Sequence, residues 1–337
     1  MSAAGALSAT GFFGAGFLVN PDLFPARRGG ETWGTREVLL TLPGGPYRFT
    51  GLNGAQEEAV RQRFGAYCGG GLGASCGGGL GASSDVVEST LFRASEVDFR
   101  TFDVRGWEYG LDIDAAPDSL RLAGLRLVGR FDWRPVLMAA LWTPDAGGQP
   151  FAGIFENFLR VLTAYRLQEL GGAVLHCAGI AALDGARARL FLGRSGAGKS
   201  TLSRLAQERG ATVLSDDLNA LMPGAAGPMV EKLPFTGDYG DTRTPAAPLP
   251  LAGLYRLEKS AADDLRPLSR AEAVACLLAC SPYVNADPHR RDGLLANFLS
   301  LLSIPKPASW LLRFSLGGSF WPILDGCPAP PSTPPAS

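Results

Sequence analysis

The segment Gly193–Ser200, which reads GRSGAGKS, constrains the fold of this 337-residue chain more than any other part of its sequence. It fits the pattern G-x-x-x-x-G-K-[ST] at every fixed position. The preceding residues Arg189–Leu192 are predicted to form a short strand, and Thr201–Glu208 a helix that ends at Gly210. A strand, a glycine-rich loop and a helix in this order are typical of a phosphate-binding loop. A chance glycine-rich turn is the alternative interpretation.

Each part of this loop has an expected chemical role. The glycines let backbone N–H groups turn toward phosphate oxygens, and the start of the following helix adds a positive dipole. We expect Lys199 to be an exposed loop side chain that reaches the β- and γ-phosphates of ATP, and Ser200 to bind Mg²⁺. The residues predicted to contact the nucleotide are Gly193, Arg194, Ser195, Gly196, Ala197, Gly198, Lys199, Ser200 and Thr201.

Two carboxylates follow the loop after a short interval. A second predicted strand, Ala211–Leu214, leads into Ser215, Asp216 and Asp217. In such a pair one carboxylate can bind Mg²⁺, while the other accepts a proton from an attacking hydroxyl. Both are therefore candidate catalytic residues and candidate metal ligands, and the sequence leaves open which does which. A pair of helix-capping Asp side chains is the alternative.

A predicted hairpin lies upstream of the loop. Val174–Leu183 is expected to form a strand that contains His176 and turns back at Asp184-Gly185 onto the strand before the loop. An antiparallel hairpin at this place is unusual, because common P-loop folds reach the loop from parallel strands. His176 is a candidate catalytic residue, and a hydrogen-bonded structural histidine is the alternative.

The stretch His176–Leu221 resembles the HPr kinase/phosphorylase family and, more distantly, the nucleotide domain of phosphoenolpyruvate carboxykinase. The shared order is His, hairpin, Ser-Gly-x-Gly-Lys-Ser loop, Arg-Gly and Asp-Asp. The resemblance implies an α/β P-loop domain of this type that binds ATP and Mg²⁺ and transfers the γ-phosphate to a serine-type hydroxyl of a peptide or protein. The residues to which it assigns these roles are His176, Lys199, Ser200, Asp216 and Asp217.

The sequence also departs from this family. Thr201 stands where the family has Glu, and the long glycine-rich signature of HPr kinases has no counterpart. The resemblance therefore does not imply HPr as the substrate, nor phosphorylase activity. Lys232 and Arg243 are the nearest basic candidates to contact a transferring phosphoryl group or an anionic substrate, and solvated surface charges are the favoured alternative. A regulatory module that binds ATP without transfer and a small-molecule kinase stay open as alternatives.

Length and composition predict a globular chain of two domains. Residues 1–150 are expected to form a smaller β-rich α+β domain, with a hairpin over 36–51, a helix from the Asn53 and Gln56 capping box to near Tyr67, and a strand over 107–113. The tandem repeat CGGGLGAS makes 68–84 a glycine-rich insertion, predicted to be mobile. Residues 151–326 are expected to form the kinase-like domain, and 327–337 a disordered proline-rich tail.

The second domain is predicted to contain three further helices. They cover Ile154–Leu170, a segment from the Ser269 and Glu272 capping box to about Cys280, and a segment from near Pro288 to Leu302. Cys276 and Cys280 share one face of the second of these, where a small hydrophobic role is favoured over metal binding.

The charge balance limits the partners. A net charge of −1 and a pI of about 6.2 supply no basic excess for binding nucleic acid or an anionic membrane.

The six cysteines show no CxxC pair and are expected to be reduced. The first 21 residues have no basic n-region and no run of about 18 apolar residues, which predicts a cytoplasmic protein, with a cryptic targeting segment as the alternative. The expected partner is a peptide or protein with an acceptor Ser, and assembly into a homo-oligomer stays open.

Overall fold

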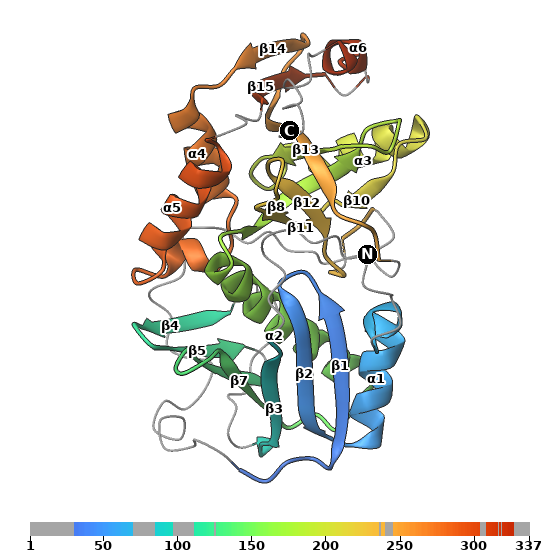
Figure 1. Cartoon of the computed structure of the whole chain (residues 1–337). Helices are drawn as coiled ribbons and strands as arrows, with labels where there is room; N and C mark the ends of the chain where they lie inside the picture. The colour runs from blue at the N-terminus through green and yellow to red at the C-terminus, as the bar shows by residue number, and fades with distance from the viewer. Residues whose placement is uncertain are drawn as a thin grey trace, which may run out of the picture. The chain divides into compact units, whose positions relative to one another are not determined.

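The computed structural model describes residues 30–69, 85–96, 111–124, 126–235, 237–239, 245–303, 308–315, 317 and 319–326. Most of the predicted glycine-rich insertion, residues 107–110 of a predicted strand, Arg243 and the proline-rich tail lie outside these ranges. The chain has an α/β fold with two mixed sheets (Figure 1). It divides into two compact units, the first ending at Leu162 and the second continuing from Thr163, inside helix α2.

The first unit is built on a seven-stranded sheet in the order β1-β2-β3-β7-β6-β5-β4. Strands β2–β3 and β3–β7 are parallel pairs and the others are antiparallel. The predicted hairpin over 36–51 is confirmed as β1 and β2. The strand bounds are β1 Arg36–Leu42, β2 Gly45–Leu52, β3 Val87–Arg93, β4 Asp112–Ala116, β5 Ser119–Gly124, β6 Leu127–Asp132 and β7 Met138–Thr143.

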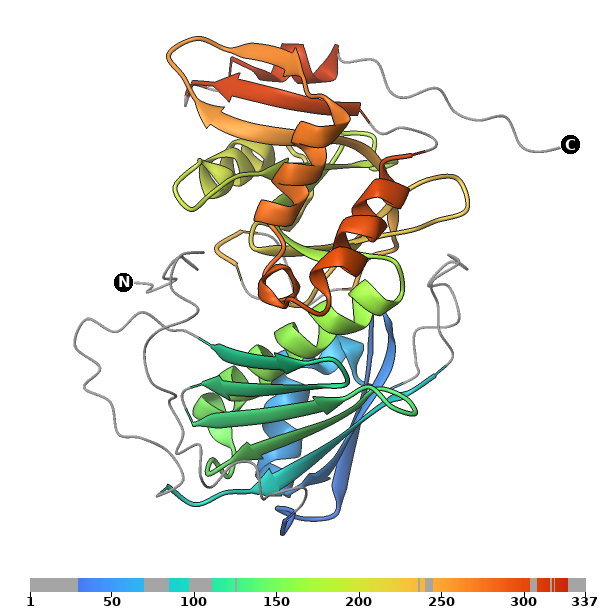
Figure 2. The ribbon, with the colours of Figure 1, turned by 90° about the vertical axis from the view of Figure 1, so that its left-hand side faces the viewer.

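Helices α1 (Gly54–Phe64) and α2 (Gly148–Glu169) pack on one face of this sheet (Figure 2). The ring centroids of Phe49 and Phe155 lie 4.6 Å apart, and those of Phe131 and Phe158 lie 5.3 Å apart. The core of this unit therefore lies between the sheet and the helices. The predicted Asn53 capping box is confirmed, and a short 3₁₀ turn, Gly65–Tyr67, follows α1. Helix α2 begins six residues before the predicted Ile154, since the first turn of a helix tolerates a proline such as Pro150.

The strands of the second unit pair in a ring. Strand β8 pairs with β9 on one side and with β10 and β11 on the other. Strand β13 pairs with β9 and β12, and β12 pairs with β11, which closes the ring. Beyond it β15 and β14 extend the sheet from β13. The bounds are β8 Ala173–Ala181, β9 Ala188–Leu192, β10 Val213–Ser215, β11 Leu218–Met222, β12 Met229–Lys232, β13 Leu249–Lys259, β14 Asp264–Pro267 and β15 Ala308–Phe314.

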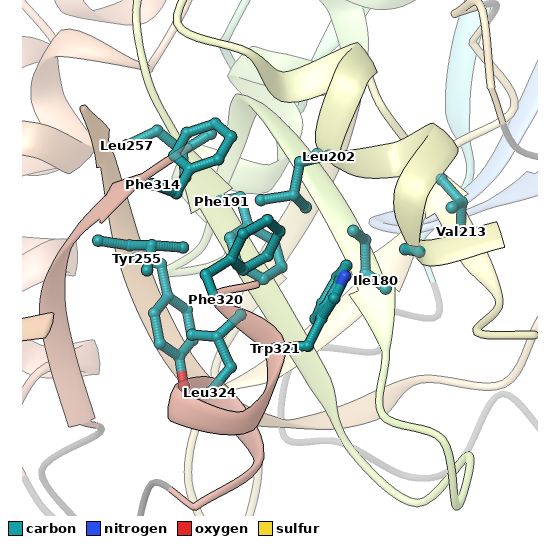
Figure 3. Packing of buried hydrophobic residues seen from close by; sticks show 13 residues of the cluster. Ile180, Phe191, Leu202, Val213, Tyr255, Leu257, Phe314, Phe320, Trp321 and Leu324 are labelled. Atoms are coloured by element: carbon teal, nitrogen blue, oxygen red, sulfur yellow. The ribbon is translucent and has the colours of Figure 1, made fainter. Parts of the chain in front are cut away.

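The helices of the second unit are α3 Lys199–Glu208, α4 Arg270–Ala279, α5 Arg291–Leu301 and α6 Trp321–Asp325, with a 3₁₀ turn at Val284–Ala286. The predicted Ser269 capping box of α4 is confirmed. Helix α3 packs on β8, and α4 packs on β13 and β15. Figure 3 shows aromatic side chains from β9, β13, β15 and the α6 region packed into one buried cluster. The ring centroids of Phe314 and Phe320 in this cluster lie 5.3 Å apart. Among the described helices, none is long and apolar enough to cross a membrane.

Candidate functional site

The loop predicted from the sequence joins β9 to α3 in the second unit. Gly196 and Gly198 have φ angles of +76° and +104°, a region that L side chains rarely adopt. Gly198 is also in close contact with Phe314, because a Cβ there would lie 2.7 Å from the ring carbon Cζ. A Cβ on Gly193 would lie 2.6 Å from the Cβ of Ala197. The loop conformation therefore requires glycine at these positions.

Backbone N–H groups at the end of the loop have no acceptor in the part of the chain that the structure describes. Gly198 is the N-cap of α3 and makes no side-chain capping bond. Within the loop, Ala197 N–H donates to Arg194 C=O at 3.0 Å. Among the described residues no acceptor is found for the N–H groups of Gly196, Gly198, Lys199, Ser200 and Thr201. Unpaired donors at a helix N-terminus favour an anion, both through hydrogen bonds and through the helix dipole.

Lys199 is buried, with 7% of its surface exposed, so the expectation of an exposed loop lysine is wrong. The packing of the second unit encloses this side chain, which the loop pattern alone does not reveal. The Lys199 ammonium donates to Gly193 C=O at 2.9 Å and to Arg194 C=O at 3.3 Å. Burial lowers the pKa of Lys199, against smaller raising effects of Cys280, Cys177, Asp217 and Asp216. No described carboxylate lies within ion-pair distance of this ammonium.

The acidic pair lies at a break between β10 and β11. Both strands run along β8, so Asp216 and Asp217 occupy an interruption in one strand line rather than a free strand end. The break is stabilised by Ser215, whose Oγ accepts the N–H groups of Asp217 at 3.2 Å and Leu218 at 3.3 Å. Buried Asn219 donates to Ser215 C=O at 3.1 Å and to a β8 carbonyl at 2.9 Å, which fixes the break against β8.

The two carboxylates have different surroundings. Asp216 is buried, with 5% of its surface exposed, and its Oδ1 accepts the Tyr239 N–H at 3.0 Å. The Asp217 side chain is 24% exposed, and its Oδ1 lies 3.8 Å from His176 Nε2. Both carboxylates interact electrostatically with Lys199. The structure therefore brings the loop lysine, the acidic pair and His176 into one region of the second unit.

The structure adds Cys280, the C-cap of α4, for which the sequence favours a small hydrophobic role over metal binding. The C=O of Cys280 accepts the N–H of His176 at 2.7 Å. Burial raises the pKa of the Cys280 thiol, against smaller lowering effects of Gly193 and Lys199. No local pattern could have identified this contact, because it joins residues 176 and 280, which lie far apart in the sequence.

A nucleotide and Mg²⁺ fit the donors and acceptors of this region. The unpaired N–H groups and the buried ammonium suit phosphate oxygens, and Ser200, Asp216 and Asp217 supply the oxygen ligands that Mg²⁺ prefers. Within the described ranges no cluster of three His, Cys, Asp or Glu side chains could hold a metal by itself. A Mg²⁺ ion here would therefore take part of its coordination from phosphate and water. Lys232 ends β12, and Arg243 is outside the described residues.

Comparison with known proteins adds no assignment. No protein-family model matches the chain, and no curated protein sequence matches it at a significant level.

Proposed function

We propose that this chain is an ATP- and Mg²⁺-dependent kinase that transfers the γ-phosphate to a serine-type hydroxyl of a peptide or protein. The observation that carries the proposal is the anion site formed by unpaired N–H groups at the start of α3 beside the buried ammonium of Lys199. A triphosphate satisfies both, because its oxygens accept the N–H groups and its charge stabilises the ammonium. The proposal includes the assignment of the second unit to the HPr kinase-like type of P-loop domain.

Different groups of the loop bind the phosphates and the Mg²⁺ ion of the nucleotide. The N–H groups of Gly196, Gly198 and Lys199 bind phosphate oxygens, and the Lys199 ammonium exchanges its two loop carbonyls for the β- and γ-phosphates. Ser200 follows on the first turn of α3, where its hydroxyl can hold Mg²⁺. The bound Mg²⁺ supplies charge neutralisation at the phosphates.

Asp216 and Asp217 have different proposed roles, one in metal binding and the other in proton transfer. Asp216 is held by the Tyr239 N–H and is buried, which suits a fixed ligand on the metal side. Asp217 is more accessible and faces His176 at 3.8 Å, which suits a group that orients the acceptor hydroxyl and takes its proton. His176 is placed to stabilise the carboxylate of Asp217 or to share that proton.

The proposal is tested first by calorimetric titration of Mg·ATP into the purified chain. Lys199→Ala should weaken binding by about tenfold or more, since it removes a charged hydrogen-bond donor to phosphate. Arg204→Ala is the matched control, because this exposed cation lies on α3 and pairs with Glu208. If the wild-type chain and Lys199→Ala bind Mg·ATP with equal affinity, these residues do not form the phosphate site.

A further inference from the structure

The backbone of Gly237 lies directly against the acidic pair. A Cβ on Gly237 would overlap Oδ1 of Asp216 and would lie 3.2 Å from the Cβ of Asp217. The φ angle of Gly237 is outside the left-handed region, so alanine could adopt this backbone conformation. The close approach to the two acids, and not backbone strain, is therefore what requires glycine at this position.

Tyr239 holds the same carboxylate two residues later. Its N–H donates to Oδ1 of Asp216 at 3.0 Å, and its side chain packs against the buried aromatic cluster. Phe235, which precedes Gly237, is fully buried. The segment is therefore fixed by a buried aromatic residue on one side of the close approach and by the aromatic cluster on the other.

The aromatic cluster also contacts the phosphate loop. Phe314 belongs to this cluster (Figure 3), and a Cβ on Gly198 would lie only 2.7 Å from Cζ of its ring. One packed cluster therefore contacts both the start of α3 and the segment that holds Asp216. Because a packed core transmits displacements of its side chains, this contact can fix the distance between the carboxylate and the loop.

We propose that residues 237–239 position the carboxylate of Asp216 relative to the phosphate loop. Gly237 does so by its close approach, and Tyr239 by its N–H. The inference rests on the proposed function in one respect, namely that Asp216 is a ligand of Mg²⁺. A carboxylate ligand needs a hydrogen bond on one oxygen to orient the other, and the Tyr239 N–H supplies this bond. Neither positioning residue needs to contact the nucleotide.

The chain offers matched variants for this segment. Gly237→Ala places a methyl group on the Asp216 carboxylate, whereas Asp216→Ala removes the carboxylate and with it the overlap. Gly317→Ala is the control, because Gly317 also lies in the second unit and its nearest neighbour for a Cβ is Ser315 Oγ at 3.9 Å, an ordinary contact. Tyr239→Phe keeps both the ring and the backbone N–H.

The direct test is hydrogen exchange of the Tyr239 amide by NMR on the full chain without nucleotide. We expect about tenfold faster exchange in Gly237→Ala and in Asp216→Ala, and little change in Gly317→Ala or Tyr239→Phe. Exchange at the wild-type rate in Gly237→Ala would overturn the inference. If Gly237→Ala does not fold, Asp216→Ala decides in the same way. This readout does not depend on any activity.

The second arm is a double-mutant cycle on the affinity for Mg·ATP, measured by calorimetry. We expect Gly237→Ala to bind about tenfold more weakly, as the loss of a partner of a metal ligand does. In the Asp216→Ala background the same change should cause no further loss, because the carboxylate that it displaces is absent. An equal loss in both backgrounds would overturn the positioning role. If the wild-type chain binds no Mg·ATP while exchange responds as expected, the proposed function fails and the hold of the segment on Asp216 stands.

Discussion

The glycines of the phosphate loop allow backbone strain to be separated from steric overlap. Gly196 and Gly198 both have positive φ angles, of +76° and +104°. A Cβ on Gly196 meets no atom within 4 Å, whereas a Cβ on Gly198 lies 2.7 Å from Cζ of the buried Phe314 ring. Alanine at the first position therefore adds only backbone strain, and alanine at the second adds strain and overlap.

The expected magnitudes differ accordingly. Gly196→Ala should lower the free energy of unfolding by about 1–2 kcal/mol, the usual cost of a side chain in the left-handed region. Gly198→Ala adds an overpacking cost of about 1–3 kcal/mol, because Phe314 lies in the buried aromatic cluster and cannot turn away freely. The total of about 2–5 kcal/mol is a large part of the stability of an ordinary domain.

The assay is urea unfolding of the ligand-free chain, followed by the fluorescence of its tryptophans. Trp321 and Trp310 lie in or against the aromatic cluster and report on the second unit. A Gly198→Ala chain that is no less stable than Gly196→Ala would refute the packing of Phe314 on the loop.

Two further predictions concern the loop lysine and the repeat. Burial lowers the pKa of Lys199, and bound triphosphate would raise it again, so nucleotide affinity should fall as the pH rises through the lowered pKa, with proton uptake. Calorimetry in buffers of different ionisation enthalpy measures this uptake, and its persistence in Lys199→Ala would assign it to another group. Deleting one copy of CGGGLGAS should change the free energy of unfolding by less than about 1 kcal/mol, since loop closure depends weakly on length. Thermal unfolding checks it, and loss of the cooperative transition would contradict it.

Local patterns were the part of the fold that the sequence could predict. The capping boxes of Asn53 and Ser269 are confirmed because each depends on two residues three positions apart. The β8–β9 hairpin and the strand-loop-helix order around Lys199 follow from short runs in the same way. The site residues named from these runs lie in one unit of the structure.

The features that could not be predicted from the sequence depend on contacts between segments that are distant along the chain. Lys199 is buried and Phe314 packs on Gly198, and both depend on the packing of distant segments. The hydrogen bond between Cys280 and His176 likewise joins the end of α4 to β8. The Asp pair was expected at a strand end, but pairing of both β10 and β11 with β8 makes it a break within one strand line. None of these arrangements has a local signal in the chain.

Transfer of labelled γ-phosphate from ATP tests the central claim most directly. The purified chain is incubated with Mg²⁺, labelled ATP and a degenerate library of serine-containing peptides, beside Asp216→Asn and Asp217→Asn. We predict labelled phosphoserine with the wild-type chain and a rate about 10² to 10⁴-fold lower for Asp217→Asn, whose affinity for Mg·ATP is retained. Asp216→Asn should also weaken Mg·ATP binding. Transfer by Asp217→Asn at the wild-type rate, or binding of Mg·ATP by the wild-type chain with no label on any serine, would contradict the account.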